Sequence, residues 1–210
     1  MKRRVILFLR EPVAGRVKSR LAAGIGRGAA VAFYRRTVAR VIRRLARDPR
    51  WELVIAVTPD GWRPGPPLFP PGLRTTPQGK GDIGDRMARM ARRFSDGEVV
   101  IAGTDIPDLG PGHIAGAFRA LGRAKMVFGP ALDGGFWLVG YRPGAARQAR
   151  FGAVRWSGEH ALGDVLKGLG ETRVSLLRPL SDVDDAADYR RVRRSGQMFL
   201  QARHQFDEIA

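Results

Sequence analysis

Six short, mostly apolar runs divide the chain at intervals and have the length and composition of β-strands. They are residues 5–9, 51–57, 99–102, 126–129, 136–141 and 173–177. The runs at 5–9 and 99–102 are continuously apolar, which is typical of a strand buried on both faces. Turn residues follow several of the runs, so we expect strands that end in loops at one edge of a sheet.

Between these runs, apolar residues recur at steps of three and four, which is the period of a helix with one buried face. The longest such series is Val31, Tyr34, Val38, Val41, Ile42 and Leu45, with arginines between its members. Further helices are expected from about residue 83 to 94, at 112–121 and at 159–169. This alternation predicts an α/β protein, and the Pro- and Gly-rich stretch 58–77 is expected to be an irregular loop.

The composition narrows the class of protein. The 210 residues are 44% hydrophobic, so we expect one domain, residues 1–210, with a sizeable core. No cysteine is present, which excludes disulfides, thiol catalysis and thiolate-bound metals. The apolar run at 5–9 is too short for a signal-peptide core or a membrane span, and we therefore expect a cytoplasmic protein.

The net charge of +17 favours partners that carry phosphate. A non-catalytic RNA-binding protein is one interpretation, because basic surfaces attract phosphate backbones. The basic residues are mostly arginines scattered over helix faces, and aromatic residues are not interleaved with them as a base-stacking platform requires. We therefore expect a phosphate-bearing small ligand rather than nucleic acid.

A basic turn follows the first predicted strand. Arg16, Lys18 and Arg20 come after the flexible Gly15, at the point where a helix should begin. Backbone N–H groups, the helix dipole and a lysine together make an anion site. The segment lacks the Gly-Lys pair of a Walker A loop, and an ordinary basic surface turn is the alternative. Its place after the first strand of an α/β chain favours phosphate binding.

Two acids follow the central run at 99–102. Asp105 and Asp108 flank Pro107 in the sequence GTDIPDL. Ligands of open α/β sheets bind at the carboxyl ends of the strands, where a carboxylate can hold a divalent cation against phosphate oxygens. The alternative is that both acids only cap the helix that begins after Pro111. We also assign Thr104, in the same loop, to nucleotide binding.

A glycine-rich helix start and a glycine-rich turn supply further candidates. Gly79 and Gly81 permit close approach to a ligand, and Gln78 can pair with a nucleobase edge through its amide. Later, Asp133 precedes Gly134 and Gly135, which would leave space for a bulky ligand beside its carboxylate. A plain turn is the alternative interpretation in both cases.

A third cluster of acids, SDVDD at 181–185, opens the last predicted helix. Acids at a helix start usually cap it or complement its dipole. One of them, Asp184, is a candidate metal ligand.

Five blocks of sequence, taken together and in order, resemble a known family. They are FLREPVAGRVKSRLAAGIG, QGKGDIGDRM, GTDIPDL, GPALDGGFWLVG and DVDDAADY. The chain resembles the bacterial glycosyltransferase-A-like family of radical-SAM/selenodomain-associated transferases, in the nucleotide-diphospho-sugar transferase superfamily. It is also similar to the nucleotidyltransferases that act on molybdenum cofactor and phospholactate. The resemblance covers nearly the whole chain.

The resemblance implies a three-layer α/β fold, with a mostly parallel twisted sheet and helices on both faces. It further implies that Asp105, with Asp184, holds Mg²⁺ or Mn²⁺ on the donor's phosphates. The basic segment from Gly15 to Arg20, with Lys18 foremost, would bind phosphate, and Gln78, Gly79 and Gly81 would lie against base and ribose. Gly134 and Gly135 would face the transferred group or the acceptor.

The function implied is metal-dependent transfer from a nucleotide-sugar to a small-molecule acceptor. Asp133 is the candidate base and Lys18 would stabilise the leaving phosphate. The alternative is a nucleotidyltransferase that joins an NTP to a phosphorylated small molecule and releases pyrophosphate. RNA binding without catalysis is the lesser alternative. The base, the sugar, the acceptor and the oligomeric state are left open.

Overall fold

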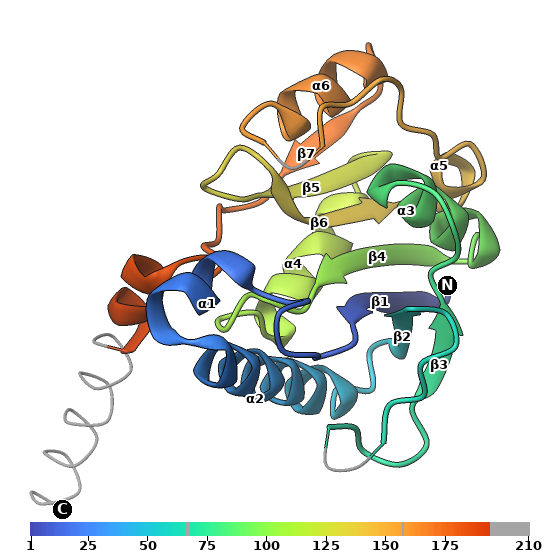
Figure 1. Ribbon diagram of the computed structural model, residues 1–210. Helices are drawn as coiled ribbons and strands as arrows, with labels where there is room; N and C mark the ends of the chain where they lie inside the picture. Colours follow the sequence, from blue (N-terminus) through green and yellow to red (C-terminus); the bar gives the residue numbers. More distant parts are fainter. Residues whose placement is uncertain (66–67, 157, 194–210) are drawn as a thin grey trace, which may run out of the picture.

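The computed structural model describes residues 1–65, 68–156 and 158–193 and contains one seven-stranded sheet (Figure 1). The strands are β1 (Arg3–Arg10), β2 (Glu52–Thr58), β3 (Arg74–Pro77), β4 (Glu98–Gly103), β5 (Met126–Pro130), β6 (Phe136–Tyr141) and β7 (Val174–Leu176). The helices are α1 (Ser19–Ile25), α2 (Arg27–Ala46), α3 (Ile83–Arg93), α4 (Pro111–Leu121), α5 (Pro143–Arg147) and α6 (Ala161–Leu169). Residues 186–193 are also helical.

The strand order is β3-β2-β1-β4-β6-β5-β7, and β6 runs against its two neighbours while the other pairs are parallel. The carboxyl ends of six strands and the amino end of β6 therefore lie at one edge, here called the carboxyl edge. The opposite edge is called the amino edge. Loops from distant parts of the sequence meet at the carboxyl edge.

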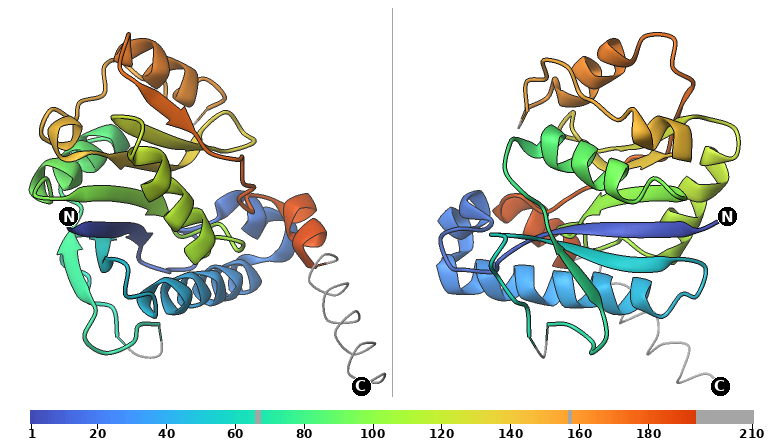
Figure 2. Two further views of the ribbon diagram at one scale, coloured as in Figure 1. Left: turned by 180° about the vertical axis from the view of Figure 1, so that it is seen from behind. Right: turned by 90° about the vertical axis from the view of Figure 1, so that its right-hand side faces the viewer.

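Helices cover both faces of the sheet (Figures 1 and 2). The core on one face combines strand residues with the apolar sides of α2 and α4, and the core on the other face uses α3, α5 and α6. Apolar residues of α2 such as Val38, Val41 and Leu45 are fully buried, as their helical spacing predicts. The predicted three-layer, mostly parallel architecture is confirmed. Among the described residues, no helix is both long and apolar enough to cross a membrane.

Two short elements were not expected from the sequence. β3 lies within the stretch 58–77, which was predicted to be a loop, and pairs with β2 alone as an edge strand. Only Thr76 of its four residues is buried, and the strand ends at Pro77, so its sequence carries little strand signal. α5 is a single five-residue helix that begins at Pro143 and is too short to show a helical period.

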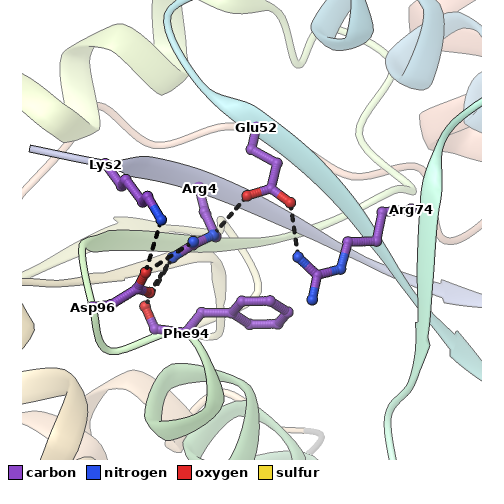
Figure 3. A network of polar contacts seen from close by, with 6 residues as sticks. All are labelled: Lys2, Arg4, Glu52, Arg74, Phe94 and Asp96. Carbon is purple, nitrogen blue, oxygen red and sulfur yellow. Dashed lines mark hydrogen bonds and ion pairs between the residues drawn. The ribbon is translucent and has the colours of Figure 1, made fainter.

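A network of charged residues closes the amino edge (Figure 3). The Arg4 guanidinium is buried and pairs through two nitrogens with Asp96, while its Nε donates to Glu52 at 2.7 Å. Arg74 donates to the other oxygen of Glu52 at 2.9 Å, and the Lys2 ammonium lies 3.5 Å from Asp96. Each carboxylate therefore contacts two cations. The network ties β1 to β2, β3 and the turn before β4.

Candidate functional site

A polar cleft of about 480 Å³ lies at the carboxyl edge of the sheet. Its lining residues come from the end of β1, from four separate segments that follow β1, β4, β5 and β7, and from α2. They are Arg10, Arg16, Val17, Lys18, Ser19, Arg20, Tyr34, Asp105, Asp133 and Asp184. The cleft thus brings together five predicted site residues from sequence positions 18 to 184.

Lys18 is the central cation of the cleft. Its ammonium lies 3.0 Å from Asp105 Oδ2 and 2.7 Å from Asp184 Oδ1, and its side chain is only 6% exposed. Burial alone would lower the pKa of this ammonium, but the charges and hydrogen bonds of the two carboxylates outweigh burial and raise the pKa. Lys18 is therefore held as a charged group.

The backbone of Lys18 is also unusual. Its φ of 49° and ψ of 49° are left-handed, and it is the one non-glycine residue with positive φ among the described residues. A side chain in this region costs about 1 kcal/mol or more, and such conformations cluster at functional sites. Lys18 directly precedes α1, so this conformation places the lysine where the loop after β1 becomes a helix.

Asp105 and Asp184 belong to a group of three carboxylates. Asp105, Asp182 and Asp184 each offer an oxygen, and these oxygens lie within 4.8 Å of one another. Burial and then the charges of Asp184 and Asp105 raise the pKa of Asp182 to about 6. Oxygen donors at this spacing suit a hard divalent cation such as Mg²⁺ or Mn²⁺. The three side chains can therefore hold a metal ion.

The sequence alone does not single out Asp182, because acids before a helix usually cap it. The chain from Ser181 to Asp184 has no helical residue, and the helix begins only at residue 186. Val183 is fully buried in a small apolar cluster with Leu21. The carboxylates of its two neighbours, Asp182 and Asp184, both lie beside Asp105. The spacing Asp-Val-Asp was the signal that could have found Asp182.

The segment that carries these acids lies beside α1, although the two are far apart in sequence (Figure 1). A Cβ on Gly24 of α1 would lie 2.6 Å from the Cβ of Ala186, which shows how closely the two backbones approach. The backbone N–H of Asp184 donates to Asp188 Oδ2 at 3.0 Å. Packing against α1 and this hydrogen bond together position Asp184 opposite Lys18.

Three arginines add positive charge around the cleft. The Arg10 guanidinium donates to the carbonyl of Arg16 at 3.3 Å, which orders the loop after β1. Arg20 lies 3.7 Å from Asp184, but its side chain is 73% exposed. Arg16 is exposed as well. Gly15, with φ of 82°, lies in the turn directly before Arg16 and does not itself line the cleft.

The structure places Gln78 and Thr104 differently from the predictions. Gln78 is 3% exposed, and its amide nitrogen donates to the carbonyls of Ala56 and Leu9 at 2.8 and 3.3 Å. Both amide protons are thus engaged, which leaves no donor for the expected pairing with a nucleobase. Thr104 is 2% exposed, and its hydroxyl donates to the carbonyl of Phe8. Both side chains tie loops to the sheet.

The two glycines after Gln78 serve a turn that side chains of α3 cover. Gly79 and Gly81 both have positive φ. A Cβ on Gly79 would lie 2.6 Å from the Arg89 guanidinium, and a Cβ on Gly81 would lie 2.5 Å from the Asp85 carboxylate. Neither glycine lines the polar cleft. In this structure, the missing side chains of the two glycines leave space for side chains of α3 rather than for a ligand.

Asp133 lines the cleft at the tight turn between β5 and β6. It is exposed, and its Oδ1 accepts a hydrogen bond of 2.9 Å from the Gly135 N–H. A Cβ on Gly134 would lie 2.2 Å from the carbonyl oxygen of Glu159. The space expected beside Gly134 for a bulky ligand is thus filled by the chain's own backbone, which corrects that prediction.

Comparison with known proteins agrees with this architecture. The profile of a family described as "Uncharacterized protein conserved in bacteria (DUF2064)" matches residues 41–158. Among solved structures, a candidate nucleotide-diphospho-sugar transferase from Desulfovibrio desulfuricans G20 matches with a TM-score of 0.74 and 27% identity. That match covers 88% of this chain and 84% of the other. No curated protein sequence matches the chain.

Two more distant matches share the fold alone. One is CMP:2-keto-3-deoxy-manno-octonic acid synthetase complexed with CTP, with a TM-score of 0.57, 11% identity and coverage of 94% of this chain and 99% of that one. The other is 4-diphosphocytidyl-2C-methyl-D-erythritol synthase from Anaerococcus prevotii, with a TM-score of 0.55 and 7% identity. That match covers 89% of this chain and 94% of the other. These two matches agree with the predicted fold class, and the Desulfovibrio desulfuricans structure, at 27% identity, bears out the resemblance to nucleotide-diphospho-sugar transferases.

Proposed function

The chain belongs to the DUF2064 family. From the geometry of its polar cleft and its match to a candidate nucleotide-diphospho-sugar transferase, we propose that it is a metal-dependent transferase of a nucleotide-activated donor. The carrying observation is the contact of Lys18 with both Asp105 and Asp184. A buried cation between acids, flanked by arginines, offers sites for a metal and for phosphate in one cleft. The donor we propose is a nucleotide-sugar, and the acceptor is a small molecule.

Each charged group has a proposed role. Asp105, Asp182 and Asp184 would hold Mg²⁺ or Mn²⁺, which when bound supplies a Lewis acid that offsets charge on the leaving phosphate. The ammonium of Lys18 would stabilise the same developing charge, and Arg16 and Arg20 would orient the phosphates. These cations belong to the loop and short helix after β1.

Asp133 is the proposed general base. Its carboxylate lines the same cleft and its Oδ2 accepts no hydrogen bond from the described residues, whereas Oδ1 is held by the Gly135 N–H. A fixed carboxylate with one free oxygen can accept the proton of an acceptor hydroxyl. This role requires an acceptor that approaches from the β5–β6 side of the cleft.

Nucleotidyl transfer is a second candidate, and the number of cations around the cleft favours it. Arg10, Arg16, Lys18 and Arg20 all line the cleft. A triphosphate carries more negative charge than the diphosphate of a nucleotide-sugar, so four basic side chains suit it well. In that reaction the same groups would stabilise the pyrophosphate that leaves.

A thermal-shift titration of the full chain tests the proposal. The ligands are nucleoside triphosphates and nucleotide-sugars, each with Mn²⁺ and with chelator. A ligand that binds only the folded protein raises Tm by mass action, with about 2.7 kcal/mol of stabilisation at 100 times Kd. We expect stabilisation by one nucleotide class in Mn²⁺ that chelator removes. A nucleotide-sugar would favour glycosyl transfer, and a triphosphate alone would favour nucleotidyl transfer.

Two variants give that titration its control. Asp105→Asn should abolish the metal-dependent shift, because it removes a ligand and leaves the fold. Asp108→Asn changes an exposed acid three residues away that does not line the cleft, and should leave the shift intact. An equal shift in both variants would overturn the assignment of Asp105. Salt-sensitive RNA binding without any nucleotide response would instead favour the RNA-binding alternative.

A further inference from the structure

A second cavity, of about 220 Å³, lies beside the polar cleft at the carboxyl edge. Its lining is almost wholly apolar and comes from β1, the start of α3, the end of β4, the first residues of β6, and the start of α6 with the segment before it. Aromatic residues Phe8, Phe136 and Trp156 form part of this lining, with Ile83 and Met87 of α3. A cavity of about 150 Å³ accommodates benzene, so this one has room for a substituted ring or a short apolar chain.

The aromatic wall of this cavity is fixed by specific contacts. The indole N–H of Trp156 donates to Asp82 Oδ2, at the amino end of α3, at 3.2 Å. The rings of Phe136 and Trp156 pack edge to face with centroids 6.3 Å apart. A Cβ on Gly84 would lie 2.4 Å from the Trp156 ring, so α3 and the tryptophan touch directly. These contacts hold the Trp156 ring in place as a wall of the cavity.

Two glycines connect the cavity to the acids of the cleft. Gly103 and Gly135 line the cavity. The Cβ position of Gly103 lies 2.9 Å from Asp105 Oδ1, and that of Gly135 lies 3.1 Å from Asp133 Oδ1. These distances place the carboxylates of Asp105 and Asp133 next to the two glycines at the edge of the cavity.

We propose that this cavity binds the acceptor, and that the acceptor is a small hydroxyl-bearing molecule with an apolar ring or short apolar chain. The proposal rests on the transferase function argued above. The apolar body would lie against Phe136 and Trp156, with its hydroxyl at the rim beside Asp133. A polysaccharide or a highly charged acceptor would not match this lining, since burying unpaired polar groups is costly.

The reaction that follows balances simply. The acceptor oxygen forms a bond to the transferred atom as the bond from that atom to the donor's phosphate oxygen breaks. The bonding electron pair leaves with the phosphate, and the hydroxyl proton passes to the carboxylate of Asp133. The cavity contributes by placing the hydroxyl within reach of that carboxylate.

Ligand-observed NMR on the full chain tests the proposal, with benzyl alcohol as the apolar probe and glycerol as a polar probe with hydroxyls. We expect saturable binding of benzyl alcohol and none of glycerol. Ile83→Asp places a charge in the wall, and because Ile83 is 39% exposed at the first position of α3 the helix should tolerate it. It should raise the Kd for benzyl alcohol at least about tenfold.

Leu132→Asp is the matched control, because Leu132 is an exposed apolar residue beside Asp133 that does not line the cavity. Its Kd should stay within about twofold of wild type. Ala161→Leu, which fills the cavity from its wall, gives a second test and should also weaken binding. Absence of saturable binding to wild type, or equal binding in Ile83→Asp, would overturn the proposal.

The nucleotide titration, run on the same protein, separates this proposal from the function on which it rests. Metal-dependent nucleotide binding without benzyl alcohol binding would reject the apolar acceptor and leave the transferase standing. Benzyl alcohol binding without any nucleotide response would reject the transferase, and the acceptor assignment with it.

Discussion

Both edges of the sheet bury a cation between two carboxylates, Arg4 at the amino edge and Lys18 at the carboxyl edge, yet the two arrangements differ in what surrounds the cation. Around Arg4, Glu52 and Asp96 each contact a further cation, so three cations surround two carboxylates and neither carboxylate lacks a cationic partner. The guanidinium engages Asp96 through two nitrogens, a geometry that holds position well.

Around Lys18, carboxylates outnumber cations. Asp105 and Asp184 both contact its ammonium. Asp182 lies beside them and forms no hydrogen bond or ion pair with a cation among the described residues. Arg20 is mostly exposed and lies 3.7 Å from Asp184. The two regions have similar residues but differ in whether every carboxylate has a cationic partner. Carboxylates that all have cationic partners suit a structural role, whereas Asp182, which has none among the described residues, is available to the proposed metal site.

The largest difference between the two edges should appear when each cation is removed. Lys18→Met should lower kcat/KM for the donor at least about 100-fold, because a preorganised charge at the leaving phosphate is lost. Steady-state kinetics with the donor identified by thermal shift would measure this. Lys167→Met removes an exposed lysine on α6 and should leave kcat/KM unchanged. A Lys18→Met enzyme with full activity would remove the functional contrast.

Arg4→Met should do the reverse. We expect the free energy of unfolding to fall by about 1–3 kcal/mol, since a buried guanidinium and its hydrogen bonds to two carboxylates are lost while those carboxylates remain partly solvated. Urea denaturation would measure the loss. The metal-dependent nucleotide shift should persist in this variant below its new Tm. Loss of that shift in a folded Arg4→Met protein would contradict a purely structural role.

The pH dependence of stability should have opposite signs at the two edges. The hydrogen bonds from Arg4 lower the pKa of Asp96 from 3.8 to about 2, so this group's stabilisation is present above pH 4 and lost as pH falls through 2. Burial raises the pKa of Asp182 to about 6. That group favours the folded state most below its unfolded pKa of 3.8, and the benefit is lost as pH rises through 6.

Two asparagine variants measure these slopes by urea denaturation in chelator. Asp182→Asn should be more stable than wild type above pH 6, with the gain disappearing towards pH 4. Asp96→Asn should be less stable than wild type at neutral pH, with the loss disappearing as pH falls from 4 to 2. Equal and parallel pH curves for the two variants would contradict the contrast between the edges.

The smallest effect is expected at the periphery of the amino-edge network. Arg74→Gln removes a pair with Glu52 in which both side chains are about half exposed, at 52% and 42%. Exposed pairs contribute about 0–1 kcal/mol, so the free energy of unfolding should change by less than 1 kcal/mol. A larger loss, compared directly with Arg4→Met, would show that the network acts as a unit rather than through Arg4.

The sequence predicted those elements whose buried residues recur with the period of a strand or a helix. The five longest strands and the helices α2, α3, α4 and α6 all have clear apolar patterns. β3 could not be predicted because an edge strand with one buried residue resembles a loop in sequence. α5 could not be predicted because five residues are too few to show a helical period. The direction of β6 was also beyond reach, since an apolar run carries no information about its partners.

The candidate site was predicted in part, for reasons that particular residues make clear. Lys18, Asp105, Asp133 and Asp184 meet in one cleft because they follow strands that end at the same edge. Gln78 and Thr104 follow strands too, but their side chains bond to buried backbone carbonyls. Only the folded backbone shows which carbonyls need a donor. These side-chain hydrogen bonds could therefore not be predicted from the sequence.

The reversed direction of β6 has a consequence for how the molecule tolerates change. Parallel neighbours need a crossover of about a dozen residues or more, and such a crossover absorbs insertions. β5 and β6 are instead joined by residues 131–135 alone, and both strands are anchored in the sheet interior. Asp133 sits in this short connection, so an added or deleted residue would displace its carboxylate directly. Length variation within the family should thus be scarce at this turn and more frequent between β2 and β3.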